Sequence, residues 1–456
     1  MSLSSRNPAT GKIIAEYQET TRTERDDILN RAMSCFRSWR DTSFKERAGV
    51  LHRAAEILLA QAEPFGRLMA EEMGKPITQG IAEAKKCAWV CSYYADHAEE
   101  FLADIPVATD ADRSYVAFQP LGPVLAVMPW NFPFWQVFRF AAPAIMAGNA
   151  AILKHASNVT GSALAIRDIF TRAGAPDGLF SVLVMPGRDV AGIIADPRIA
   201  AVTLTGSTPA GRAVARAAGA ALKKSLLELG GSDPYIILED ADLDQAAKTC
   251  VASRLINSGQ SCIAAKRFIV VESVRDEFEQ LVTEAMTRAH MGDPLQPETE
   301  VGPLARLDLR SELHRQVTES VAQGAKLLTG GAVPKGPGAF YPPTVLTDVT
   351  ADSPCYREET FGPVAAIIPV ADERQAVTAA NDTSFGLGAA VFSRDLERAE
   401  RVAKRLEAGS CFVNGFVKSD PRLPFGGIKE SGYGRELGSF GIREFVNIKT
   451  IWVRGT

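Results

Sequence analysis

Apolar residues recur at helical spacing over the first third of the chain. Between Phe44 and Met73 they follow one another at three- and four-residue steps, among them Val50, Leu51, Ala54, Ile57, Leu58 and Ala62. This period predicts a helix with one buried face, and Gly74-Lys75-Pro76 predicts its end. A second helix is predicted from about Thr78 to Leu102. Residues 104–121 alternate polar and apolar positions instead, which predicts an exposed hairpin.

After residue 121, short β-like runs alternate with turns and helix-like stretches. The runs are Val124–Met128, Ala150–Leu153, Ser181–Met185 and Ala200–Thr205. This alternation predicts a doubly wound parallel sheet with helices on both faces. A second series begins near Pro234, so the boundary between two α/β domains is expected near Gly230-Gly231. The pattern of Phe445–Val453 predicts a late strand. Such a strand needs a sheet to join, either in this chain or in a neighbouring subunit.

Composition narrows the class of protein. Hydrophobic residues make up 46% and charged residues 23%, as in ordinary globular proteins, and the net charge of −4 favours neither nucleic acid nor a membrane surface as a partner. No apolar run reaches the roughly 18 residues of a membrane span. The N-terminus lacks the layout of a secretory signal, and the seven cysteines are too sparse for a disulfide framework, so a reducing cytoplasm is expected.

Metal and serine-hydrolase chemistry find no support in the sequence. The five histidines form no H-E-x-x-H pair, no C-x-x-C accompanies them, and no G-x-S-x-G occurs. We therefore expect no metal site.

One strand–turn–helix segment is a candidate phosphate site. Gly206-Ser207-Thr208 follows a β-like run, and Gly211 lies on the first turn of the next helix. Free backbone N–H groups at a helix start bind phosphate, although the spacing is not G-x-G-x-x-G. Phosphate binding and a purely structural turn are both compatible with this segment.

Two residues are candidates for covalent chemistry. Cys262 follows the polar turn Asn257–Ser261, whereas most lone cysteines are buried small apolar residues. Glu228 ends the apolar run SLLE; it could be a helix-end residue in solvent, or a base whose pKa is raised by apolar neighbours.

Eight motifs in order resemble the aldehyde dehydrogenase superfamily across nearly the whole chain. They are Pro129-Trp-Asn-Phe-Pro133, Lys154, Gly206-Ser-Thr, Glu228-Leu-Gly-Gly231, Gly259-Gln-Ser-Cys262, Glu359-Thr-Phe-Gly-Pro363, Asn414-Gly and Pro424-Phe-Gly-Gly427. The resemblance implies that Cys262 attacks the aldehyde and carries a thioester. It implies that Asn131 and the Cys262 backbone N–H hold the oxyanion, and that Glu228 activates the hydrolytic water with Glu436 in support. A free thiol is mostly protonated at pH 7, so local activation of Cys262 is expected.

The resemblance also implies a site for NAD or NADP. Lys154 matches a ribose contact, Ser207 a pyrophosphate contact, and Glu359 a nicotinamide-ribose contact with Phe361 beside it. The remaining cofactor residues implied are Trp130, Gly206, Gly211 and Leu229. The family often has Lys-Pro-(Ser/Ala)-Glu at the ribose, but here the segment ends in Ser157. An uncharged residue there leaves room for a 2′-phosphate, so use of both cofactors is expected.

The substrate side most resembles bacterial succinate-semialdehyde dehydrogenases. Arg139 matches an arginine that binds the substrate carboxylate, which suits a guanidinium fork; the alternative is an ion-paired surface arginine. Ser419, Ser261 and Phe425 complete the expected substrate site. A second arginine common in that group is replaced by Ile256, and Arg254 and Lys418 are the two candidates to take its place. Ala264 removes a second cysteine found in some relatives.

Three other functions are alternatives: oxidation of uncharged or aromatic aldehydes, transfer of the thioester to CoA, and a non-catalytic role. The last two fit poorly with the presence of Glu228, Cys262 and Asn131. The expected fold has an NAD(P)-binding domain of Rossmann type (1–102 and 121–230), a catalytic α/β domain (231–435) and a small β oligomerisation element (103–120 and 436–456). A homodimer or homotetramer is expected, with a small aldehyde as the only other partner.

Overall fold

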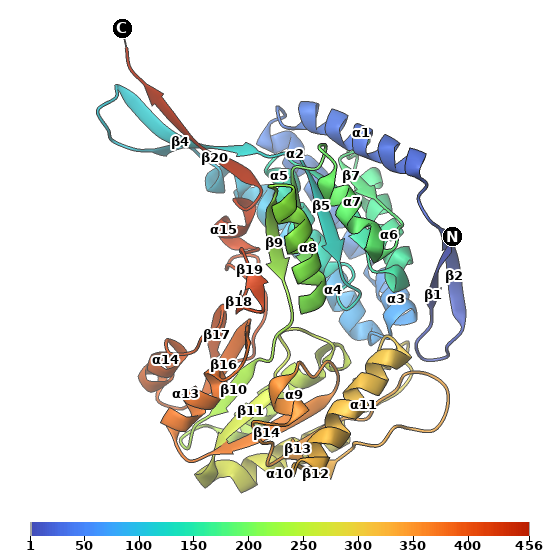
Figure 1. Ribbon diagram of the computed structural model, residues 1–456, viewed down its shortest axis with the longest axis vertical. Helices are drawn as coiled ribbons and strands as arrows, with labels where there is room; N and C mark the ends of the chain where they lie inside the picture. The colour runs from blue at the N-terminus through green and yellow to red at the C-terminus, as the bar shows by residue number, and fades with distance from the viewer. Residues whose placement is uncertain (1, 456) are drawn as a thin grey trace.

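The computed structural model describes residues 2–455, and its two large sheets correspond to the two predicted strand series (Figure 1). The first sheet has six strands in the order β19-β9-β8-β5-β6-β7, parallel except for β19. The predicted runs near 124, 150, 181 and 200 are confirmed as strands of this sheet. The bounds are β5 Pro123–Met128, β6 Ala150–His155, β7 Phe180–Val182, β8 Ala201–Thr205, β9 Lys224–Glu228 and β19 Gly432–Tyr433.

Eight helices accompany this sheet. They are α1 Arg22–Trp39, α2 Phe44–Ala60, α3 Ala62–Met73, α4 Ile77–Phe101, α5 Trp135–Met146, α6 Thr160–Arg172, α7 Val190–Ala195 and α8 Thr208–Ala220. The single helix predicted over 44–73 was wrong: α2 and α3 are separate, with Gln61 between them at φ −116°. Pro64 explains the break, because in a continuous helix it would lack an N–H for the carbonyl of Ala60 and would clash with it.

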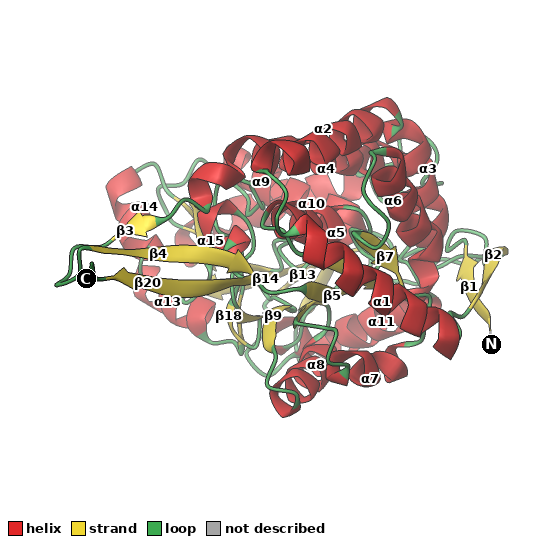
Figure 2. Ribbon diagram, turned by 90° about the horizontal axis from the view of Figure 1, so that it is seen from above, coloured by secondary structure: helices red, strands yellow, loops and turns green. Residues whose placement is uncertain are grey.

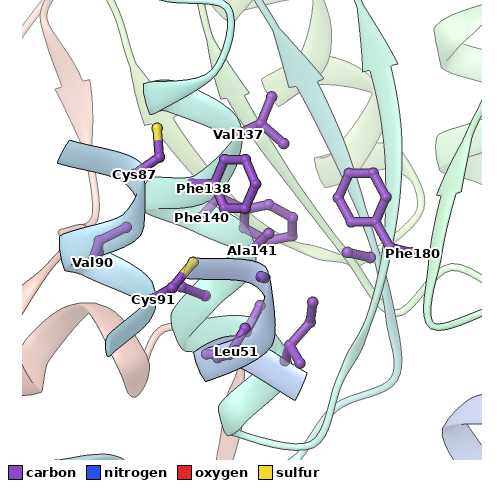
Figure 3. Close-up of a cluster of buried hydrophobic side chains, with 14 of the residues drawn as sticks. Leu51, Cys87, Val90, Cys91, Val137, Phe138, Phe140, Ala141 and Phe180 are labelled. Atoms are coloured by element: carbon purple, nitrogen blue, oxygen red, sulfur yellow. The ribbon is translucent and has the colours of Figure 1, made fainter. Parts of the chain in front are cut away.

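Helix α5 lies at the centre of the apolar core, with all of its residues buried. Figure 3 shows Cys87, Val90 and Cys91 of α4 close to the residues of α5, with Phe180 of β7 beyond them. The ring of Phe170 stacks between those of Phe138 and Phe180, with centroids 5.3 Å and 4.5 Å away. A helix buried on all sides is a rigid support for the residues at its start, which reach the site described below.

The second sheet has seven strands in the order β12-β13-β14-β11-β10-β16-β17, parallel except for β12. Its strands are β10 Pro234–Ile237, β11 Arg267–Val271, β12 Lys326–Thr329, β13 Thr344–Thr347, β14 Val364–Val370, β16 Gly388–Phe392 and β17 Ser410–Val413. Its helices are α9 Leu243–Leu255, α10 Arg275–Arg288, α11 Leu307–Ala322, α12 Pro354–Arg357, α13 Glu373–Asn381 and α14 Leu396–Ala403. Tyr235 and Ile236 belong to different apolar clusters, so both faces of this sheet are covered.

A three-stranded antiparallel ribbon projects from the body (Figures 1 and 2). The predicted hairpin and late strand are confirmed, and they pair within one chain: β3 Ile105–Pro106, β4 Arg113–Pro120 and β20 Val446–Val453. Just before β20, α15 (Gly438–Ile442) packs on α4 and α5. Two short pairs complete the strands: β1 Ser2–Arg6 with β2 Ile13–Gln18, and β15 Phe385–Gly386 with β18 Ile428–Lys429. Across residues 2–455, no helix is both long and apolar enough to cross a membrane.

Candidate active site

The loop that carries Cys262 has an unusual backbone. Between α9 and β11, Asn257 and Ser258 take left-handed conformations at φ 53° and 56°, and Gly259 follows at φ 77°. A Cβ on Gly259 would lie 2.2 Å from the carbonyl oxygen of Gly362, so glycine is required there by both conformation and space. The fully buried Arg254 donates a 2.6 Å hydrogen bond to the Gly259 carbonyl. Cys262 therefore follows a tightly held turn and keeps a partly exposed side chain.

Asn131 connects this loop to the first sheet. It follows β5, and its Nδ2 donates to the carbonyl of Gln260 at 3.1 Å. In return, Asn257 Nδ2 donates to the Asn131 carbonyl at 2.7 Å, while Gln136 Nε2 donates to Asn131 Oδ1 at 3.1 Å. The side-chain amide of Asn131 is thus held beside the backbone of Gln260, two residues before Cys262. In this position it can donate a hydrogen bond to an oxygen of a bound substrate. Gln136 and Asn257 were not singled out in the sequence because their partners are distant along the chain or belong to the backbone.

Cys262 opens into a cavity of about 550 Å³. All four predicted substrate residues line this cavity: Arg139, Ser261, Ser419 and Phe425. Its walls also include three aromatic residues and one lysine to which the sequence assigned no role, namely Trp89, Phe132, Trp135 and Lys86. Lys86 and Trp89 in α4 and Trp135 in α5 have the helical spacing of ordinary core residues, and Phe132 lies in the turn before α5, so only the tertiary structure identifies them as cavity walls.

Activation of the Cys262 thiol would require a lowered pKa, and none is found, so that prediction was wrong. Burial raises the pKa of Cys262 to about 12, while Lys266 and Arg139 act in the opposite direction. Lys266 Nζ donates to the carbonyls of Ser261 at 3.0 Å and Cys262 at 2.6 Å. The ammonium therefore holds the backbone of the loop, and the resting thiol is protonated near neutral pH.

Glu228 is a buried residue at the end of β9 and not a helix-end residue in solvent. Burial, followed by the nearby carboxylate of Glu436, raises the pKa of Glu228 well above its ordinary value, in the predicted direction. A Cβ on Gly426 would lie 2.7 Å from Glu228 Oε1, so this carboxyl lies directly against the Pro424–Gly427 segment. Neither Glu228 nor Glu436 lines the cavity of Cys262.

Arg139 is ion-paired, as the alternative interpretation of the sequence expected, but it is buried and not on the surface. Its guanidinium forms an ion pair with Glu436, donates to Thr205 Oγ1 at 3.3 Å, and lies 4.8 Å from the ring centroid of Phe425. Burial raises the pKa of Glu436, and Arg139 lowers it. The positive charge that Arg139 brings to the cavity is thus partly compensated from within the protein.

The two proposed substitutes for the missing arginine at Ile256 differ in place. Ile256 itself lines the cavity, and so does the exposed Lys418. Arg254 does not: it lies beneath the loop, bound to the Gly259 carbonyl, so its suggested role as a substrate contact was wrong. A residue two positions from the expected one points to a different side of the local backbone.

The residues predicted to bind the cofactor's phosphates lie where β8 leads into α8. Ser207 caps α8, and its side chain makes no cap hydrogen bond, so N–H groups of the first turn stay available. A Cβ on Gly211 would lie 2.5 Å from Leu229 Cδ2, which explains a glycine that lets the helix pack against the segment after β9. Gly206 directly follows β8, next to this helix start.

The predicted ribose and nicotinamide residues lie on both sides of the interdomain boundary. The carboxyl of Glu359 accepts from Gly231 N at 3.1 Å and is 3.5 Å from Lys266 Nζ. The rings of Trp130 and Phe361 meet edge to face at 5.7 Å. At the end of β6, burial lowers the pKa of Lys154, and the half-buried Ser157 follows at the start of a 3-10 turn, Ser157–Val159. These polar groups and small residues at the carboxyl ends of parallel strands fit a dinucleotide.

Within residues 2–455, no cluster of three or more His, Cys, Asp or Glu side chains is arranged to hold a metal ion. The seven cysteines are all free thiols.

Comparison with known proteins agrees with this geometry. The family model described as "Aldehyde dehydrogenase family" matches residues 1–451. A probable succinate-semialdehyde dehydrogenase [NADP(+)] of Synechocystis sp. is 52% identical over 99% of this chain and 100% of its own length. The succinate-semialdehyde dehydrogenase [NADP(+)] of Mycobacterium avium is 50% identical over 99% and 97%. The crystal structure of succinic semialdehyde dehydrogenase from Streptococcus pyogenes in complex with NADP+ superposes with a TM-score of 0.97 at 40% identity, covering 99% of this chain and all of that one. The resemblance noted in the sequence is therefore confirmed, and the chain belongs to the aldehyde dehydrogenase family.

Proposed function

We propose that this protein oxidises succinate semialdehyde to succinate, with NADP or NAD as the hydride acceptor. The observation that carries the proposal is one cavity in which the Cys262 thiol faces apolar aromatic walls together with the polar groups of Arg139 and Ser419. An aldehyde with a short aliphatic chain and a terminal carboxylate fits such a lining. The names of the relatives from Synechocystis and Mycobacterium avium support the same substrate.

In this proposal, the Cys262 thiol gives its proton to a water molecule, and the sulfur then attacks the aldehyde carbon. The amide of Asn131 and the backbone N–H of Cys262 donate to the oxygen that becomes negative. The nicotinamide, when bound, supplies the oxidising chemistry by accepting a hydride. Ionised Glu228 then takes a proton from water as that water attacks the thioester, releasing the acid and the Cys262 sulfur. Glu436, which is paired with Arg139, helps to raise the pKa of Glu228 and so makes it a stronger base.

The cofactor would lie along the carboxyl edge of the six-stranded sheet. We assign the pyrophosphate to the helix start at Gly206 and Ser207, with Gly211 and Leu229 shaping its floor. Lys154 and Ser157 would contact the adenosine ribose, and Glu359 the nicotinamide ribose beside Trp130 and Phe361. Because Ser157 carries no charge, it does not repel a 2′-phosphate, and the NADP-named relatives agree with that choice.

We propose that the chain has three structural units. They are a cofactor-binding domain (1–102 and 121–230), a catalytic domain (231–435) and an oligomerisation element (103–120 and 436–456). The separate sheets support the division, although β19 (Gly432–Tyr433) joins the first sheet. We propose assembly into a homodimer or homotetramer through the projecting ribbon, where Ile448 and Trp452 are exposed apolar side chains. Seven free cysteines favour a reducing cytoplasm.

Formation of reduced cofactor, followed by absorbance, tests the function. We expect succinate semialdehyde to give a higher kcat/KM than pentanal or benzaldehyde, and NADP to be accepted. Cys262→Ala should abolish turnover, whereas Cys411→Ala, at a half-buried strand position, should retain it. Equal or better turnover of pentanal, or no activity with NADP, would contradict the proposal.

Uncharged aldehydes are the second candidate substrates. The compensated charge of Arg139 and the aromatic walls of the cavity favour them. The same panel of aldehydes separates the two candidates, since only the first predicts a strong preference for the carboxylate.

A further inference from the structure

The cavity of Cys262 contains a lysine that none of the sequence motifs includes. Lys86 lies in the middle of α4, and its Nζ donates a 2.9 Å hydrogen bond to Ser419 Oγ across 333 residues of sequence. Its ammonium lies 4.1 Å from the ring centroid of Trp135. Both of these partners line the cavity with it. The ammonium is therefore held inside the site by a hydroxyl and an aromatic face.

The other charged side chains around Lys86 are paired or exposed to solvent. On its own helix, Glu83 is paired with Lys75 and accepts from two backbone N–H groups of α5. On α5, Arg139 is paired with Glu436. On the loop after β17, Asp420 is paired with Arg422 at 2.7 Å, and Lys418 is exposed to solvent.

Within residues 2–455, Lys86 itself forms no ion pair. A half-buried ammonium that has no carboxylate in ion-pair contact and faces a cavity with aromatic walls attracts an anion.

We propose that Lys86, together with Ser419, binds the carboxylate of the substrate and is the cation that selects a carboxylate-bearing aldehyde. This inference rests on the proposed function, and it identifies the charge that replaces the arginine missing at Ile256. Lys86 reaches the cavity from α4, whereas Ile256 lies directly after α9. Substrate binding would let the carboxylate accept from Lys86 Nζ and from the Ser419 hydroxyl.

The protonation of Lys86 gives this role a pH signature. Burial, and then the charge of Arg139, lower the pKa of Lys86 to about 8, while Cys87, Glu83 and Asp420 act in the opposite direction. An amine is charged below its pKa, so the free enzyme attracts the carboxylate below about pH 8 and loses this attraction above it. A bound carboxylate favours the charged form in turn.

The test compares succinate semialdehyde with pentanal, which has a similar chain and no charge. Taking the ratio of the two kcat/KM values cancels the ionisations of Cys262 and Glu228, which both substrates share. For Lys86→Met at about pH 7, we expect the ratio to fall about 10- to 100-fold, as for loss of one charge-assisted hydrogen bond. Lys85→Met, an exposed neighbour on the same helix, should leave the ratio unchanged.

Lys86→Arg provides a readout that a purely structural role would not affect. Its charge persists at all accessible pH values, so this variant should keep the preference and lose the decline above about pH 8 that the wild type shows. A wild-type preference that survives in Lys86→Met, or a decline that persists in Lys86→Arg, overturns the role of Lys86 and leaves the proposed function standing. A wild-type enzyme without any preference for succinate semialdehyde overturns both.

Discussion

Glu83 is predicted to be the anchor of the segment that presents Asn131. This buried side chain of α4 receives hydrogen bonds at 2.9 Å from the backbone N–H groups of both Phe134 and Trp135, at the start of α5. It also forms an ion pair with the fully buried Lys75. A carboxylate at a helix start satisfies free N–H groups and complements the helix dipole. Glu83→Ala removes all of these interactions together.

The expected cost follows from the contacts. Removing one partner of a buried ion pair typically costs about 3–5 kcal/mol, and buried donors left without acceptors cost about 1–3 kcal/mol. The terms overlap, and burial already lowers the pKa of Lys75, so its ammonium can release its proton once Glu83 is gone. Deprotonation limits the penalty, and we expect a loss of about 3–4 kcal/mol in unfolding free energy.

Urea unfolding gives the global change, and hydrogen exchange of peptides covering residues 134–146 gives the local one. The double variant Lys75→Met/Glu83→Ala should be more stable than Glu83→Ala, because the unpaired amine is removed as well. Glu99→Ala, an exposed position on the same helix, should change stability by no more than about 0.5 kcal/mol. A loss below about 1 kcal/mol for Glu83→Ala, with normal protection over 134–146, would refute the anchoring role.

Three further predictions concern the catalytic base, the cofactor and the Cys262 loop. Burial and the nearby carboxylate of Glu436 raise the pKa of Glu228, so kcat should still climb with pH above the range in which ordinary carboxyl groups titrate, since only the ionised carboxyl accepts a proton. Glu228→Gln should remove this rise, and a flat wild-type profile contradicts the assignment. Ser157→Glu should lower kcat/KM for NADP relative to NAD about 10- to 100-fold by charge repulsion; an unchanged ratio would place the 2′-phosphate elsewhere. Gly259→Ala should lower the unfolding free energy by about 2–4 kcal/mol and remove most activity, because its Cβ would clash with Gly362. The control Gly219→Ala, which has open space in α8, should be neutral or slightly stabilising. Equal urea midpoints for the two variants would argue against strain at Gly259.

Local patterns were sufficient for much of the fold. The alternation of β-like and helix-like runs predicted the strands near 124, 150, 181 and 200, and the exposed hairpin was recognised from its polar alternation. The break at Gln61 was missed because apolar spacing continues through it; Pro64 carried the signal. The loop before Cys262 was recognised as a turn. The left-handed conformations of Asn257 and Ser258 and the close approach of Gly259 to Gly362 could not be predicted, because the segments that contact this loop are distant along the chain.

The sequence by itself determined the class of fold, the family, and which residues are candidates for nucleophile, base and oxyanion donor, because these depend on local periodicity and on motifs in a set order. Only the tertiary structure decided the charge state of the site. It pairs Arg139 with Glu436, raises the pKa of Cys262 by burial, and brings Lys86 to Ser419. Such effects depend on the distance between groups and on exclusion of water, and residues hundreds of positions apart acquire both only when the chain folds.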